Sequence, residues 1–289
     1  MSAETLNEAE PKPRMRLRVR AARLALVALL TYTGVCVVLG FLQSKLIYFP
    51  SRGYSDTPAD LGLEYEDLRL TASDGVKVAA WFVGHPNASA SVIFLHGNAG
   101  NMSGRLDTLR VLHRAGFNVL MLDYRGYGES EGSPTEQGTY ADVEAAWRHL
   151  TDVKGEPPRR IVLFGRSLGG AIAIESARRH EPGALVVDAT FTNLHDIGRL
   201  HYPFLPVGWL LTYRYDSLEK VPHVRCPKLF IHAADDSLIP ISNGRRLFEA
   251  AAEPKEFLET PGEHNTGGFE YSPEYTARTV SFINRAIGR

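Results

Sequence analysis

The residues best placed for nucleophilic chemistry form a Gly-x-Ser-x-Gly segment, Gly165-Arg166-Ser167-Leu168-Gly169. It follows a short apolar run at 161–164 and opens a stretch of small and aliphatic residues typical of a helix. A serine that attacks an acyl carbon must be raised on a tight strand-to-helix turn, and glycine on both sides lets the two backbones approach closely. We therefore predict Ser167 as the nucleophile and the backbone N–H of Leu168, at the start of the helix, as a donor to an oxyanion.

A second glycine-containing loop, His96-Gly97-Asn98-Ala99-Gly100-Asn101, directly follows the apolar run at 91–95. In enzymes that carry their serine on a strand-to-helix turn, the loop after this early strand supplies the second oxyanion donor, which assigns that role to the N–H of Asn98. Each such donor typically contributes about 3–4 kcal/mol of transition-state stabilisation. A phosphate-binding loop is the alternative, but the spacing matches neither a P-loop nor a dinucleotide-binding fingerprint.

The general base is predicted from chain order, because enzymes of this kind run nucleophile, acid, base along the sequence. Of the ten histidines, His264 alone follows the acidic residues of the 230s, and it lies in a loop before the last predicted helix. The acid is less sharply defined, because Asp235 and Asp236 are neighbours and Asp188 ends an earlier apolar run. An orienting acid stands at the carboxyl end of a strand and accepts from the imidazole N–H, which Asp236, four residues before Pro240, fits best.

The segment DYRGYGES at 123–130 combines charged side chains with two glycines after another apolar run. Asp123 and Arg125 can fasten this loop through charge-assisted hydrogen bonds, while the glycines permit tight turns. We interpret the segment as structural rather than catalytic.

Short apolar runs alternate with longer helix-like stretches over most of the chain. The predicted strands lie at 92–95, 119–122, 161–164, 185–187 and 229–231, and the predicted helices lie near 104–114, 139–151, 168–180, 243–252 and 273–286. Two further strands around the Asp74-Gly75 turn are expected to form a hairpin. This alternation predicts an α/β fold with a mostly parallel central sheet and helices on both faces. The segment 191–226, rich in proline and aromatic residues, breaks the alternation and is predicted to be a small cap over one rim of the site.

The composition fits one large core and gives no indication of a nucleic-acid partner. The 289 residues are 44% hydrophobic, and the formal net charge is -1. A charge so close to zero does not favour a strongly charged partner. Because Cys36 and Cys226 are the two cysteines, neither a disulfide framework nor a cysteine-rich metal site is expected. The chemistry predicted for Ser167 requires no metal or organic cofactor.

An uncharged stretch of about 19 residues, 24–42, is long enough as a helix to cross a hydrocarbon core roughly 30 Å thick. Six Lys or Arg residues precede it, Lys45 and Arg52 closely follow it, and no small-x-small cleavage site comes after it. We therefore predict a disordered basic tail at 1–20, a transmembrane signal anchor at 21–43, a linker at 44–61 and a catalytic domain at 62–289. Because basic residues favour the cytoplasmic side, we expect the amino terminus in the cytoplasm and the catalytic domain in the periplasm or an equivalent exterior space.

Six ordered motifs resemble the Bem46-like branch of the serine α/β-hydrolases: HGNAGN at 96–101, DYRGYGES at 123–130, GRSLGG at 165–170, DSLEKVPHVRCP at 216–227, DDSLIP at 235–240 and GEHN at 262–265. The resemblance covers roughly residues 45–288 and implies an α/β-hydrolase fold with Ser167, Asp236 and His264 as the catalytic triad. Many bacterial members are similar in having one N-terminal hydrophobic anchor.

The sequence departs from the pattern of this family at two places near the expected site. Relatives commonly have glycine where this chain has Ala233, and a Glu-Ser-Pro-like turn where it has Asp188-Ala189-Thr190. Animal relatives that remove palmitoyl groups from proteins have a cysteine-rich amino terminus, which Cys36 alone does not reproduce. Depalmitoylation is therefore not implied.

These features together predict a serine esterase or thioesterase that acts on a small or lipid-like acyl substrate of neutral or weakly polar character. A peptidase or amidase uses the same triad and is the alternative among enzymes. A non-catalytic, membrane-tethered binding protein on the same fold is an alternative of another class, which the presence of three triad residues and two glycine-rich loops disfavours.

Overall fold

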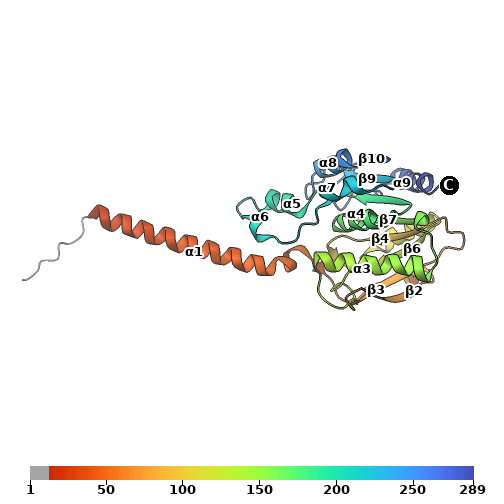
Figure 1. The fold of residues 1–289 in the computed structure, drawn as a ribbon, viewed down its shortest axis with the longest axis horizontal. Coiled ribbons are helices and arrows are strands. Elements are labelled where there is room, and N and C mark those ends of the chain that lie inside the picture. The colour runs from red at the N-terminus through yellow and green to blue at the C-terminus, as the bar shows by residue number, and fades with distance from the viewer. Residues whose placement is uncertain (1–12) are drawn as a thin grey trace, which may run out of the picture. The chain divides into compact units, whose positions relative to one another are not determined.

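The computed structural model describes residues 13–289, which divide into two compact units, one ending at Gln43 and the other comprising Ser44–Arg289. The first unit consists of most of helix α1 (Pro13–Ile47), drawn in orange in Figure 1. Proline suits the first turn of a helix because its missing N–H would have no partner there, and the Arg, Leu and Met residues that follow are good helix formers. The prediction of a disordered tail at 1–20 is therefore wrong for residues 13–20, and residues 1–12 lie outside the described part of the chain.

Helix α1 is, within residues 13–289, the one helix long and apolar enough to cross a membrane. Its apolar part, Leu17–Ile47, has 31 residues, and the most apolar 18-residue window has a mean hydropathy of 2.3. Large apolar side chains such as Leu30, Val38 and Phe41 are exposed along it. Such a surface is unfavourable in water and suits lipid, so length and composition both fit a membrane-spanning helix.

The second unit is built on an eight-stranded sheet, counted over the described residues, in the order β10-β9-β8-β7-β4-β6-β3-β2. Its strands are β2 (Glu66–Thr71), β3 (Lys77–Val83), β4 (Ser91–Leu95), β6 (Asn118–Leu122), β7 (Ile161–Arg166), β8 (Ala184–Asp188), β9 (Lys228–Ala233) and β10 (Lys255–Thr260). Strands β10, β9, β8, β7, β4 and β6 run parallel to one another. Strands β2 and β3 form an antiparallel hairpin, and β3 pairs antiparallel with β6. The predicted hairpin and the mostly parallel sheet are confirmed.

Helices cover both faces of this sheet, as the strand-helix alternation predicts. One face is covered by α2 (Leu106–Arg114) and α9 (Pro273–Ala286), the other by α3 (Glu136–Arg148), α4 (Leu168–His180) and α8 (Ser242–Ala250). Successive side chains of a strand point to opposite faces, so Ile93 and Leu95 of β4 join one core cluster while Val92 and Phe94 join the other. Shorter turns complete the connections: η2 (Met102–Arg105), η3 (His149–Val153), η4 (Pro158–Arg160) and η5 (Val221–His223).

Residues 44–61, predicted to be a linker, belong instead to the second unit. Strand β1 (Phe49–Pro50) pairs with β5 (Ala99–Gly100), and a short 3-10 helix, η1, spans Pro58–Leu61. Tyr48 is 2% exposed, and Tyr54 packs against Trp81 with ring centroids 4.8 Å apart. The prediction was wrong because the prolines and glycines of this segment set fixed turns, while Tyr48 is buried and Tyr54 is half-buried against the core of the second unit.

The segment 191–226 stands between β8 and β9 and contains three short helices, as expected for a cap. These are α5 (Leu194–His201), α6 (Val207–Leu210) and α7 (Ser217–Lys220). Its inner end is held to α8 by Asn243 Oδ1, which accepts from the Thr192 hydroxyl at 3.0 Å. His201 Nε2 donates to the carbonyl of Leu238 at 2.8 Å, so the cap lies beside the loop that follows β9. This is the loop that carries the predicted acid.

Candidate active site

The register of the parallel strands brings the predicted site loops to one edge of the sheet. Leu95 at the end of β4 pairs with Gly165 of β7, which places the loop at 96–101 next to the turn at Ser167. Ala233 at the end of β9 pairs with Thr260 at the end of β10, so the loops after these strands leave the sheet together. Ligands of α/β sheets bind at this carboxyl edge.

Ser167 occupies a strained turn between β7 and α4. Its backbone has φ 53° and ψ -120°, a region that residues other than glycine rarely adopt and that costs of order 1–3 kcal/mol. The flanking glycines are needed for close packing, since a Cβ on Gly169 would lie 2.7 Å from the carbonyl oxygen of His96 and one on Gly165 would lie 2.6 Å from Gly170 Cα. The turn therefore has the geometry expected for a raised nucleophile.

The structure brings Ser167, His264 and Asp236 into one hydrogen-bonded chain. The hydroxyl of Ser167 lies 3.2 Å from His264 Nε2, and His264 Nδ1 donates to Asp236 Oδ2 at 2.7 Å. All three are largely buried, with exposed fractions of 8%, 7% and 4%. Because an ionised carboxylate can only accept, the proton lies on Nδ1, and the Nε2 lone pair faces the serine hydroxyl. A serine, an imidazole and a carboxylate in this order can perform nucleophilic acyl transfer.

Hydrogen bonding keeps Asp236 ionised in spite of its burial. Burial alone would raise the pKa of this carboxyl, but the nearby His232 ring and hydrogen bonds from His264 and the Ile239 N–H outweigh it and hold the pKa well below its usual range. The Ile239 N–H donates to Asp236 Oδ1 at 2.7 Å. His232, to which the sequence analysis gave no role, lies with Nε2 3.5 Å from Asp236 Oδ2 and donates to the Ile239 carbonyl at 2.7 Å. Its side chain thus stabilises the loop that presents the acid.

The two alternative acids lie elsewhere. Asp235 is exposed, and Asp188 is fully buried at the end of β8, where its Oδ2 accepts from the Phe269 N–H at 3.4 Å. In the described chain neither carboxylate hydrogen-bonds to His264. Burial raises the pKa of Asp188, although the positive charge of Arg166 opposes that shift. The position of Asp236 four residues before Pro240 identified the carboxylate that contacts the imidazole.

The backbone at Asn98 is fixed beside Ser167. A Cβ on the preceding residue, Gly97, would lie 3.4 Å from Ser167 Cβ and 3.9 Å from its Oγ, so the loop passes close to the serine. The Asn98 carbonyl accepts from the Phe49 N–H at 2.9 Å and from the Tyr127 hydroxyl at 2.7 Å. Leu168 is the first residue of α4, where backbone N–H groups have no intrahelical partner. Both predicted oxyanion donors thus belong to backbone segments adjacent to Ser167.

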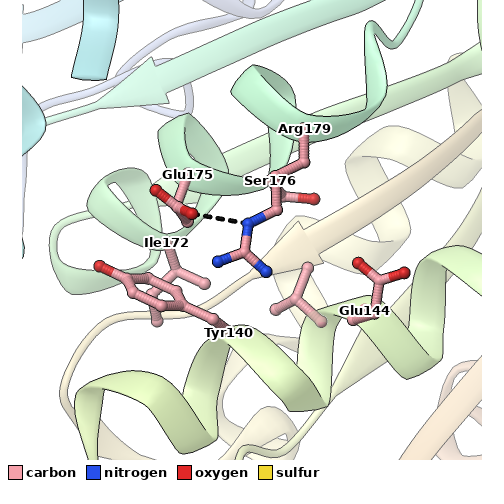
Figure 2. A pocket seen from close by; sticks show the side chains of 7 residues that line it. Tyr140, Glu144, Ile172, Glu175, Ser176 and Arg179 are labelled. Atoms are coloured by element: carbon pink, nitrogen blue, oxygen red, sulfur yellow. Dashed lines mark hydrogen bonds and ion pairs between the residues drawn. The ribbon is translucent and has the colours of Figure 1, made fainter. Parts of the chain in front are cut away.

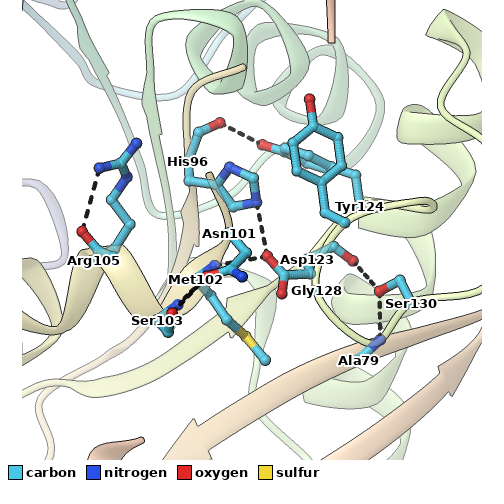
Figure 3. A network of polar contacts seen from close by, with 12 residues as sticks. Ala79, His96, Asn101, Met102, Ser103, Arg105, Asp123, Tyr124, Gly128 and Ser130 are labelled. Carbon is cyan, nitrogen blue, oxygen red and sulfur yellow. Dashed lines mark hydrogen bonds and ion pairs between the residues drawn. The ribbon is translucent and has the colours of Figure 1, made fainter. Parts of the chain in front are cut away.

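Asp123 contacts both ends of the loop at 96–101 and holds it in place (Figure 3). Its Oδ1 accepts from the Met102 N–H at 2.7 Å and lies 3.1 Å from His96 Nε2, and Ser130 Oγ donates to its carbonyl at 2.7 Å. Arg125 in turn binds two carboxylates, Asp74 at 2.6 Å and Asp142 at 2.8 Å. These bonds confirm the structural interpretation of the segment 123–130.

Arg166 makes a contact that the sequence analysis did not foresee. Its Nη2 donates to the carbonyl of His264 at 2.9 Å, and its Nη1 lies 3.9 Å from Glu270 Oε2. Burial raises the pKa of Glu270, and the positive charge of Arg166 opposes this shift. The residue before Ser167 therefore fixes the position of the loop that carries the His264 imidazole.

A separate small hollow lies between α3 and α4 (Figure 2). Glu175 in its wall accepts from Arg179 at 2.6 Å and from Arg178 at 2.9 Å, and Lys220 Nζ lies 3.2 Å away. Glu144, the other carboxylate in its wall, lies 2.6 Å from His180 Nε2, so both carboxylates have partners, and no member of the Ser167 chain lines the hollow. Over the described residues, no group of three or more His, Cys, Asp or Glu side chains is arranged to hold a metal ion.

One family model and several known proteins are similar in sequence to this chain. The Hydrolase_4 family model, described as Serine aminopeptidase, S33, matches residues 86–218. The uncharacterized protein Rv2307c of Mycobacterium tuberculosis is 37% identical over 247 residues, covering 85% of this chain and 88% of the relative. The alpha/beta hydrolase domain-containing protein WAV2 of Arabidopsis thaliana is 34% identical, with coverage of 87% and 90%. The uncharacterized membrane protein YNL320W of Saccharomyces cerevisiae is 31% identical, with coverage of 85% and 91%.

Solved structures share the fold. The Pyrococcus furiosus esterase Pf2001 is similar with a TM-score of 0.72 and 24% identity, over 84% of this chain and 98% of that chain. A Mycobacterium tuberculosis puromycin-hydrolyzing peptidase has a TM-score of 0.63 and 20% identity, over 78% of this chain and 40% of that chain. Fold, family model and relatives agree with the motifs, and the chain belongs to the Bem46-like family of α/β-hydrolases.

Proposed function

We propose that this chain is a serine hydrolase that cleaves an ester or thioester through a covalent acyl-enzyme, with Ser167 as nucleophile, His264 as base and Asp236 as orienting acid. The observation that carries the proposal is the continuous contact from Asp236 Oδ2 to His264 Nδ1 at 2.7 Å and from His264 Nε2 to Ser167 Oγ at 3.2 Å. The strained backbone of Ser167 adds support, because such strain persists at functional sites.

In the acylation step, Ser167 Oγ forms a bond to the acyl carbon while His264 Nε2 takes the hydroxyl proton. The acyl oxygen becomes an oxyanion and accepts hydrogen bonds from the N–H groups of Asn98 and Leu168. The bond from the acyl carbon to the leaving group then breaks, and His264 returns the proton to the departing alcohol or thiol. Asp236 stabilises the imidazolium that forms between these steps.

In the deacylation step, His264 takes a proton from a water molecule whose oxygen attacks the acyl carbon of the acyl-enzyme. The same two N–H groups stabilise the second oxyanion. The bond to Ser167 Oγ then breaks, Ser167 recovers its proton from His264, and the carboxylic acid leaves. The residues named supply every proton transfer in this cycle.

Amide cleavage is the second candidate, because the matching family model is described as a serine aminopeptidase and one structural neighbour is a puromycin-hydrolyzing peptidase. The esterase Pf2001 supports the first candidate. Oxygen and sulfur leaving groups depart more readily than nitrogen, so esters and thioesters demand less of the same triad. A non-catalytic binding role is disfavoured by the intact chain of contacts at Ser167.

A direct test is to profile the full chain in detergent against esters of increasing acyl length, matched thioesters and aminoacyl amides. A serine-directed fluorophosphonate shows in parallel whether the serine is nucleophilic. Turnover of esters or thioesters at least as fast as of amides supports the proposal, whereas preferred amide cleavage favours the peptidase. Absence of both labelling and turnover supports the binding protein.

We further propose that α1 is a single-pass signal anchor with its amino terminus in the cytoplasm and the catalytic unit on the exterior side. Five arginines and one lysine precede the apolar stretch, whereas Lys45 and Arg52 closely follow it. The name of the yeast relative, a membrane protein, supports a membrane location. Protease added to cells with a permeabilised outer barrier should digest the catalytic unit and spare the amino terminus; the opposite result would reverse the orientation.

A further inference from the structure

The cap carries large apolar side chains that the fold leaves exposed. Leu200, Tyr202, Phe204 and Trp209, which we call the cap ridge, are 52%, 54%, 68% and 94% exposed. Single exposed apolar residues are ordinary, but four large ones within ten residues, of which Tyr202 and Phe204 pack edge-on with ring centroids 6.3 Å apart, are unusual and can mark an interaction site. The helices α5 and α6, which carry two of them, stand out from the edge of the catalytic unit (Figure 1).

Basic side chains lie within the stretch that carries the cap ridge. Residues 197–215 contain Arg199 and Arg214 but neither aspartate nor glutamate, although Asp196 and Asp216 border the stretch and Asp196 Oδ1 lies 3.7 Å from Arg199 Nη1. Tryptophan and tyrosine are enriched at membrane–water interfaces, and basic side chains are attracted to anionic headgroups. Within this stretch, exposed apolar and aromatic side chains together with two arginines therefore fit a lipid surface.

The cap contacts the place where the chain enters the catalytic unit. The ring of Tyr48 packs edge-on against Tyr213 with centroids 5.8 Å apart, and its hydroxyl lies 2.7 Å from that of Tyr215. Tyr48 directly follows the last residue of α1, so few residues of chain separate the apolar helix from a residue that contacts the cap. A short covalent connection limits how far the second unit can move from a bilayer that holds α1.

The cap ridge is also connected to the catalytic acid. His201, between two ridge residues in the sequence, donates to the Leu238 carbonyl at 2.8 Å. The Leu238 N–H donates to Asp236 Oδ1 at 3.0 Å, and the Leu238 side chain is 46% exposed. The apolar surface of the cap thus continues onto the loop of Asp236.

We propose that the cap ridge inserts into the headgroup region of the bilayer that holds α1, and that the active site takes acyl substrates from that bilayer. The proposal rests on the proposed membrane anchoring and hydrolase function. Partial burial of Phe204 and Trp209 in lipid removes apolar surface from water, and Arg199 and Arg214 lie among the headgroups.

The tryptophans of the chain provide a direct test. Of the three, Trp81 and Trp147 are 1% and 5% exposed, whereas Trp209 is 94% exposed. The full chain is reconstituted into vesicles of phosphatidylcholine and phosphatidylglycerol, with or without bromine on the acyl chains, and is separated from unbound protein by flotation. Bromine quenches tryptophan that lies in the bilayer, and the Trp209→Phe variant isolates the signal of Trp209.

Quenching of most of the Trp209 emission, together with a blue shift that the Trp209→Phe variant lacks, supports insertion of the cap ridge. Flotation without quenching overturns it and leaves the anchor intact. Failure to float overturns both the anchor and the ridge proposal, whereas the hydrolase proposal is judged separately by turnover of a soluble ester.

Substrate access is tested by the double variant Phe204→Ser with Trp209→Ser. Its kcat/KM should fall several-fold for a long-chain ester embedded in vesicles and stay unchanged for a short soluble ester. Val153→Ser is the matched control, because Val153 is 70% exposed on η3, outside the cap. Equal effects on both substrates, or an equal loss in Val153→Ser, would overturn the delivery of substrate from the bilayer.

Discussion

The guanidinium of Arg166 lies 2.9 Å from the carbonyl oxygen of His264, so the residue before Ser167 holds the loop that carries His264. Both ends of the proposed proton transfer, Ser167 and His264, are thereby fixed to the same strand, β7. The contact joins residues 98 positions apart, and Glu270 supports it from the same loop. Arg166 is thus a positioning residue in the proposed site, since it acts through His264.

Arg166→Gln should lower kcat and leave KM nearly unchanged. A hydrogen bond to a charged group is worth about 1.5–3 kcal/mol, which corresponds to roughly 10- to 100-fold in rate if the whole amount is lost from the transition state. Arg166→Lys should recover part of the loss. Steady-state kinetics on a soluble ester measures this split, and a change confined to KM would assign Arg166 to substrate binding.

Asp236→Asn should lower kcat about ten-thousandfold, because an amide mis-sets the tautomer of His264. The matched control is Asp235→Asn, since Asp235 is the exposed neighbour and should have little effect. Kinetics of the two purified variants, with circular dichroism to verify folding, checks the assignment. Greater damage from Asp188→Asn than from Asp236→Asn would move the acid to β8.

Local sequence patterns predicted part of the fold and of the site, but not the contacts between distant segments. Ser167, His264 and Asp236 follow from a motif and its chain order, and the buried strands follow from apolar runs, because both depend on local pattern. The Arg166–His264 bond, the support from His232 and the burial of Tyr48 depend on contacts between distant segments, which no local pattern encodes. The same holds for the packing of 44–61, which the prolines and glycines of that segment suggested was a linker.

The unfolding free energy should depend on pH through Asp188. Burial raises the pKa of this carboxyl, so the folded protein keeps the proton to a higher pH than the unfolded chain does. Stability from this group is complete below the ordinary carboxyl pKa of about 3.9 and falls as pH rises through the raised value. Asp188→Asn should remove that decline. The denaturant midpoint of the variant, relative to that of the wild type, should therefore increase from acid to neutral pH. Parallel pH profiles would contradict the raised pKa.

Gly169→Ala should destabilise the fold by about 1–3 kcal/mol, the usual cost of overpacking, or prevent folding. A Cβ at this position would lie 2.7 Å from the backbone oxygen of His96, which cannot move without disturbing β4. Gly104→Ala is the control, because nothing lies within 4 Å of a Cβ there. Thermal unfolding of both variants compares them, and equal midpoints would show that the turn at Ser167 tolerates a side chain.

The central claim is that Ser167 forms the acyl-enzyme, and turnover by Ser167→Ala is its most direct test. Removing a triad nucleophile typically costs on the order of a millionfold in kcat. We expect the variant to fold with an unchanged circular dichroism spectrum, to resist labelling by a fluorophosphonate and to lose nearly all turnover of the best ester or thioester substrate. A rate equal to that of the wild type, in a folded Ser167→Ala protein, would contradict the account.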